Sequence, residues 1–179
     1  MRISRIMAVV VIAALPVTFL VWTPRSHAHD DDDSRSLGGS WVATVTPNPI
    51  FVCGGPQVAP APMPFTELAT YAEGGTLTET NTQLNANSAM LSPGFPFSGS
   101  DGHGVWERSG GHFEATFRKL VFDPSGAYVA NADISEKLTV QGSDHNRLSG
   151  SFTITFTFVN NNPPLCSSGE LEAKRMVVD

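Results

Sequence analysis

The 179-residue chain has few basic residues, few cysteines and only one long hydrophobic run, and each shortage excludes a class of protein. Eleven Lys and Arg residues face 17 Asp and Glu residues, for a formal net charge of -6, and the basic residues are scattered. Nucleic acid and anionic lipid bind to a basic face that releases counterions, so we expect neither as a partner. The sequence also lacks a Ser-His-Asp arrangement, a phosphate loop and a spaced metal-ligand cluster, so we expect no metal and no cofactor.

The one long hydrophobic run lies at the N-terminus, from Ile6 to Trp22. Arg2 and Arg5 precede it and the small-residue pattern Ser26-His27-Ala28 follows it, as in a signal peptide cleaved after Ala28. The alternative is an uncleaved membrane anchor, because the run is nearly long enough to span a bilayer. We expect residues 1–28 to be a signal peptide. The processed protein is then secreted or periplasmic, with no stable membrane insertion.

Residues 29–38 follow the predicted cleavage site and begin with His29 and four adjacent aspartates, Asp30 to Asp33. A calcium-binding loop spaces its carboxylates and places a glycine at its turn, and this run has neither feature. We therefore interpret residues 29–38 as a disordered acidic leader. Residues 39–179 have the length of one ordinary domain with a single core.

Only two cysteines occur, Cys53 and Cys166. In a protein sent to an oxidising compartment, a lone pair predicts a disulfide. A structural zinc site would need further ligands, and neither cysteine has a neighbouring histidine that would suggest a nucleophile.

The rest of the chain has no helical period and consists of short alternating runs separated by Gly, Pro, Asn and Ser, which is an all-β pattern. The clearest run, Leu148 to Phe158, alternates apolar with hydroxylated residues. With it, the pattern predicts about eight strands: Trp41–Thr46, Phe65–Ala72, Thr76–Asn81, Gly104–Arg108, His112–Phe122, Tyr128–Val140, Leu148–Phe158 and Gly169–Val177. Most turns are short, which implies antiparallel neighbours. Two long connections, residues 47–64 and 83–102, are expected at the ends of the sheet.

The cysteine positions favour a closed sheet. In an up-and-down barrel of about eight strands, the end of the first strand lies beside the start of the last. Cys53 follows the first predicted strand and Cys166 precedes the last, whereas an open sheet would place them beyond the reach of a disulfide. We therefore predict a single antiparallel up-and-down barrel.

Gly39-Ser40-Trp41 at the start of the first strand, with Arg175 near the end of the last, resembles the calycin pattern of lipocalin-type small barrels. The resemblance implies that Arg175 packs across the Trp41 ring and closes the base of the barrel. The chain departs from lipocalins in having no predicted helix before its last strand. The stretch Gly102 to Arg108 is also similar to uncharacterised bacterial exported proteins, and the strand count alone is compatible with allene-oxide-cyclase-like or dirigent-like barrels.

A buried acid near a histidine suggests one catalytic hypothesis. Glu79 shares a strand face with Leu77. His103 and Glu107 share a face with Val105, although either register of that short strand is possible. If all three point inward, Glu79 could act as a general base with His103 or Glu107. The alternative is that Glu79 pairs with Arg175 or Arg118 in a satisfied polar layer.

The leading functional hypothesis is a non-enzymatic exported barrel that holds a small hydrophobic ligand in its interior or at the mouth framed by the two long connections. An eight-stranded barrel either fills with its own side chains or holds one small ligand. Among the 11 phenylalanines, Phe117, Phe152 and Phe156 are the candidate ligand contacts. The alternatives are a cyclase or isomerase with an acid–base pair in the barrel, and a structural, envelope-associated protein.

Overall fold

The computed structural model describes residues 36–84 and 97–177, all within one compact unit of the chain, Asp32–Asp179. The predicted signal peptide and residues 29–35 of the predicted leader lie outside these ranges. Within them, we find no helix with the length and apolar character needed to cross a membrane.

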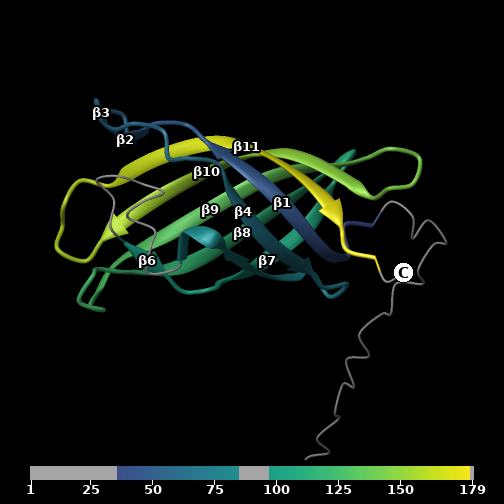
Figure 1. Cartoon of the computed structure of the whole chain (residues 1–179), viewed down its shortest axis with the longest axis horizontal. Helices are drawn as coiled ribbons and strands as arrows, with labels where there is room; N and C mark the ends of the chain where they lie inside the picture. Colours follow the sequence, from purple (N-terminus) through teal and green to yellow (C-terminus); the bar gives the residue numbers. More distant parts are fainter. Residues whose placement is uncertain (1–35, 85–96, 178–179) are drawn as a thin grey trace, which may run out of the picture. The chain divides into compact units, whose positions relative to one another are not determined.

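Eight antiparallel strands form a closed barrel, as predicted, because each pairs with the next and β11 pairs with β1 (Figure 1). The closing ladder runs from Trp41 opposite Arg175 to Pro47 opposite Gly169. The barrel strands are β1 (Gly39–Pro47), β4 (Phe65–Tyr71), β5 (Thr76–Asn81), β7 (Gly102–Ser109), β8 (His112–Phe122), β9 (Tyr128–Gln141), β10 (Arg147–Phe158) and β11 (Leu165–Arg175).

The strand order is not strictly up-and-down, because three short strands interrupt the long connections. Strands β2 (Ile50–Val52) and β3 (Gln57–Ala59) form a hairpin that pairs with the start of β11. Strand β6 (Ser98–Gly99) pairs with the end of β8. A short 3-10 helix, η2 (Thr82–Leu84), follows β5. All four elements lie at the same end of the barrel, where β1 ends and β11 begins.

The other end of the barrel is closed by Trp41 and Arg175. The Arg175 guanidinium lies 4.3 Å from the centre of the Trp41 ring, and it donates hydrogen bonds to the carbonyls of Ser36 (2.8 Å) and Gly38. The indole Nε1 of Trp41 donates to the carbonyl of Leu37 at 2.9 Å, and the Leu37 side chain is fully buried. Residues 36–38 therefore belong to the folded barrel, although we had placed them in the acidic leader.

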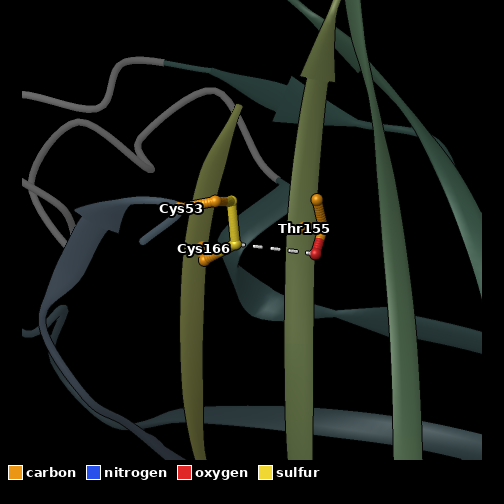
Figure 2. Close-up of a disulfide and its surroundings, with 3 residues drawn as sticks. All are labelled: Cys53, Thr155 and Cys166. Carbon is orange, nitrogen blue, oxygen red and sulfur yellow. Dashed lines mark hydrogen bonds between the residues drawn. A yellow bond between two sulfur atoms is a disulfide. The ribbon is translucent and has the colours of Figure 1, made fainter. Parts of the chain in front are cut away.

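The Cys53–Cys166 disulfide is present, with Cα atoms 5.0 Å apart and a separation of 113 residues (Figure 2). Cys166 lies within β11 and pairs with Phe51 of β2, so the last strand begins four residues before the predicted Gly169. Residues 165–168 lack an alternating pattern. They are extended because β10 and β2 supply hydrogen-bonding partners on both sides. The disulfide thus ties the β2–β3 hairpin to the start of the last barrel strand.

Candidate functional site

The barrel contains a cavity of about 120 Å³ at the end that carries the disulfide. Its wall comes from the end of β1, the start of β4, the middle of β9 and β11, and the second halves of β5, β8 and β10. Gln83 and the segment 97–99 complete the wall, so both the barrel and its second long connection contribute. A cavity of about 150 Å³ in another protein holds one benzene molecule, so this one fits a molecule of about one ring.

Most of the wall is apolar. Phe117, Phe152 and Phe156, the three candidate ligand contacts predicted from the sequence, all line the cavity. They face inward because alternate residues of β8 and β10 point into the barrel. The other apolar wall residues are Val45, Phe65, Phe97, Val121, Ala132, Ile134, Ile154 and Leu171.

Strands β4, β5, β8 and β9 each place one charged side chain inside the barrel. These side chains are Glu67, Glu79, Lys119 and Glu136, between 2% and 6% exposed, and all four line the cavity. Each occupies an inward position in an alternating strand, where its neighbours two residues away are buried or half-buried. We call these four residues the charged layer.

Glu79 and Lys119 form an ion pair inside the charged layer, with Lys119 Nζ 2.5 Å from Glu79 Oε2. The side-chain amide of Asn81 donates to the other oxygen, Glu79 Oε1, at 2.7 Å. Gly102 leaves room for this carboxylate, because a Cβ there would lie 2.8 Å from Glu79 Oε2 and 2.7 Å from the Phe117 ring. Glu79 is thus a fully paired buried acid.

The other two carboxyls have no cation of their own. Tyr71 donates a hydrogen bond from its hydroxyl to Glu136 Oε2 at 3.0 Å. Burial raises the pKa of Glu136 to about 7, and the charge of Glu79 adds to the rise, while the Tyr71 hydrogen bond opposes it. The pKa of Glu67 is raised well above its ordinary value, first by burial and then by Glu136 and Glu79. Glu67 and Glu136 therefore hold protons under conditions where exposed carboxyls are ionised.

Gln83 adds an unsatisfied group to the cavity wall. Its Nε2 atom is buried and has no hydrogen-bond partner among residues 36–84 and 97–177. Buried polar atoms almost always have a partner, so this amide indicates a position where something other than these residues would bind.

The structure does not bring together the acid and histidine predicted from the sequence. Glu79 lies inside the barrel, whereas His103 and Glu107 are exposed on the outer face of β7, as is Val105 at 61% exposure. Strand β7 has the opposite register to the one that this hypothesis needs, because Trp106 points inward in place of Val105.

The inward Trp106 makes edge contacts with Tyr71 and Phe113, and Gly104, which also faces inward, packs against the backbone of β8. The alternative partners of Glu79 are also absent: Arg175 lies at the other end of the barrel and Arg118 pairs with Asp133 on the surface.

Glu67, Lys119 and Glu136 were not singled out in the sequence, although a signal for them exists. Lys119 follows Phe113, Ala115 and Phe117 at intervals of two residues, and Glu136 lies between Ile134 and Leu138 in the same way. When a charged residue occupies one of the alternate positions that otherwise carry apolar residues, its side chain is expected to point into the barrel.

Comparisons with protein-family models, with curated proteins and with solved structures each found no match to this chain. The closed eight-stranded antiparallel barrel is therefore established by the strand pairing alone. Across the part of the chain that the structure describes, no group of three or more His, Cys, Asp or Glu side chains is arranged to hold a metal ion.

Proposed function

We propose that this protein is an exported, lipocalin-like barrel that binds one small, largely apolar molecule in the cavity beside the charged layer. The observation that carries the proposal is the cavity itself, which lies in a barrel interior that side chains otherwise fill. Its volume of about 120 Å³ is below the roughly 300 Å³ of sites that hold drug-sized ligands. The ligand is therefore of about one ring, smaller than a lipid or a pigment.

Two further observations support the exported and lipocalin-like parts of the proposal. The Cys53–Cys166 disulfide suits an oxidising compartment, which agrees with the predicted signal peptide and with a secreted or periplasmic location. The contact of Arg175 with Trp41 at the closed end agrees with the calycin resemblance.

A ligand screen tests the proposal. Purified protein is titrated with one-ring compounds, among them phenol, toluene and benzyl alcohol, while two-dimensional NMR spectra are recorded. We expect saturable shifts that concentrate on residues of the cavity wall, such as Phe117, Ala132 and Ile154. If no one-ring compound binds, the cavity has no ligand function and the structural, envelope-associated alternative takes its place.

A second candidate function is an acid–base enzyme such as an isomerase, and the pKa of Glu136, raised to about 7, favours it. A group with a pKa near neutrality can both accept and donate a proton at physiological pH. In this version Glu136 replaces the predicted pair of Glu79 with His103. Incubation of each bound compound in D2O, followed by NMR, tests it: an enzyme exchanges or rearranges protons of its ligand and Glu136→Gln abolishes this, whereas a binding protein returns the ligand unchanged.

A further inference from the structure

The charged layer is unbalanced. It contains three carboxyls and one ammonium group, and the ammonium of Lys119 is already paired with Glu79 at 2.5 Å. Lys119 is the only basic side chain among the described residues that line the cavity. Burial and the neighbouring carboxyls raise the pKa of Glu67 by more than Lys119 lowers it, so Glu67 and Glu136 have no cation of their own, in surroundings where an isolated carboxylate is strongly disfavoured.

We propose that the ligand of this cavity is a small protonated amine attached to an apolar body of about one ring, and that it binds in exchange for a proton of Glu136 or Glu67. The inference rests on the proposed function and specifies the chemistry of its ligand. In the exchange, one carboxylic acid releases its proton to solvent and the ligand's N–H groups donate to the resulting carboxylate. No covalent bond forms or breaks apart from that O–H bond.

The groups around Glu136 favour a cation over other ligands. A bound anion would meet three carboxyls and a lysine that is already paired, and a neutral molecule would gain no charge pairing. An ammonium would pair with a carboxylate and would also lie among phenylalanine rings, which attract cations. The titratable side chains that face Glu136 are Tyr71 and Glu67 from β4, Glu79 from β5 and Lys119 from β8. Strands β1, β10 and β11 contribute Val45, Phe152 and Leu171 to the same wall.

Gln83 adds a hydrogen-bond donor to the same wall, because its buried Nε2 atom has no partner among residues 36–84 and 97–177. Its Nε2 atom would donate to an acceptor on the ligand or on a water molecule that enters with it. The charged layer and this amide lie on the wall of one cavity, so a single ligand of about one ring can contact both.

Three probes of the same body and different charge test the inference: benzylamine, benzyl alcohol and benzoate, titrated into the full-length protein by isothermal calorimetry at pH 7.5. We expect benzylamine to bind at least about tenfold more tightly than benzyl alcohol, since a desolvated charge pair is worth more than a neutral contact. Benzoate is expected not to bind. If benzyl alcohol equals or exceeds benzylamine, the amine inference is wrong and the proposed function stands. If no one-ring compound binds, both fail.

Proton exchange gives a second readout that apolar binding alone would not produce. An ammonium like that of lysine stays protonated well above neutrality, so only the carboxyl titrates in this range. The affinity for benzylamine is therefore expected to rise about tenfold for each unit of increasing pH up to pH 7 and to stay constant above it. Titrations in buffers of different ionisation enthalpy should show release of about one proton at pH 6. Affinity that does not change between pH 5 and pH 8 would overturn the exchange.

Glutamine variants assign the exchange to its residues. Glu136→Gln and Glu67→Gln keep the shape of the side chain, and at least one should lower benzylamine affinity about tenfold and flatten its pH dependence. Benzyl alcohol binding by the same variant shows that the cavity is intact. Glu170→Gln, on the exposed face of β11, is the matched control and should behave as the unmodified protein. Equal effects of the interior and exposed variants would contradict the proposal.

Discussion

At the scale of single residues, two ion pairs among the described residues, one of a lysine and one of an arginine with a carboxylate, differ greatly in exposure. The side chains of Lys119 and Glu79 are 7% and 1% exposed, whereas those of Arg118 and Asp133 are 59% and 39% exposed. Water screens the second pair, so its contribution to stability is small, despite its two hydrogen bonds. The first pair is isolated from water, and loss of either partner would leave a buried charge without compensation.

Lys119→Met should therefore lower the free energy of unfolding by about 3–5 kcal/mol at pH 7, because Glu79 would lose its counter-charge. Urea denaturation followed by Trp fluorescence measures this. The matched control is Arg118→Met on the same strand, which removes the exposed pair and should cost no more than about 1 kcal/mol. Equal losses in the two variants would show that the buried pair has no special role.

The raised pKa of Glu136 makes a prediction about stability and pH. The folded protein keeps this proton up to about pH 7, whereas the unfolded chain releases it near the ordinary value of 4.5. Between those pH values the folded state binds more protons at this group, so its contribution to stability is greatest below pH 4.5 and falls by about 3 kcal/mol as the pH rises to 7.

Glu136→Gln cannot ionise, so the stability difference between it and the unmodified protein should grow in favour of the variant from pH 4.5 to 7. Urea denaturation at intervals of half a pH unit measures that difference. Glu170→Gln, an exposed change, should show no such trend. A constant difference for Glu136→Gln across this range would mean that the carboxyl is ionised throughout.

At the scale of elements, alternation in the sequence predicted all eight barrel strands, and the cysteine positions predicted closure. The three short strands were missed because two or three residues are too few to show a period. They form through pairing: β2 with β11, β3 with β2, and β6 with β8. The register of β7 could not be predicted either, because it depends on contacts of Trp106 with Tyr71 and Phe113 from other strands. The charged layer has the same origin: single strands indicate inward charges, and only barrel closure brings four of them together.

The disulfide acts at this scale, because it joins the β2–β3 hairpin to β11 across 113 residues. In the chain-entropy model a loop of about 100 residues stabilises the folded state by up to about 4.7 kcal/mol. The double variant Cys53→Ser, Cys166→Ser should thus lose roughly 2–5 kcal/mol and still form the barrel, which the β1–β11 ladder closes independently. Urea denaturation of the oxidised protein and the double variant compares them, and coincident midpoints would contradict a stabilising role.

At the scale of the whole barrel, the two ends have different compositions. One end is filled by Leu37, Trp41 and Tyr71, with Arg175 across the Trp41 ring. The other end carries the disulfide, the hairpin and the cavity, with the charged layer below the apolar wall. The cavity end also contains the Glu79–Lys119 pair and the disulfide, which stabilise the fold, but the space of the cavity makes no stabilising contact. A side chain that only fills this space should therefore affect binding without unfolding the barrel.

Ala132→Leu tests whether the cavity can be filled in this way. Ala132 is 3% exposed, lines the cavity and faces Lys119 of β8 and Phe156 of β10 across the sheet. A leucine there would occupy part of the roughly 120 Å³ that we assign to the ligand. Filling a cavity costs little or stabilises when space exists, so we expect a change of about 1 kcal/mol or less in the free energy of unfolding. Benzyl alcohol and benzylamine should each bind at least about tenfold more weakly.

The matched control is Thr153→Leu, which adds a side chain of similar size to the exposed face of β10. It should leave both affinities unchanged, and calorimetry on the three proteins under one set of conditions makes the comparison. If Ala132→Leu binds both compounds as tightly as the unmodified protein, the ligand does not occupy this cavity. If it loses binding and several kcal/mol of stability together, the added side chain disturbs the barrel, and the expectation that the cavity can be filled without cost to the fold is wrong.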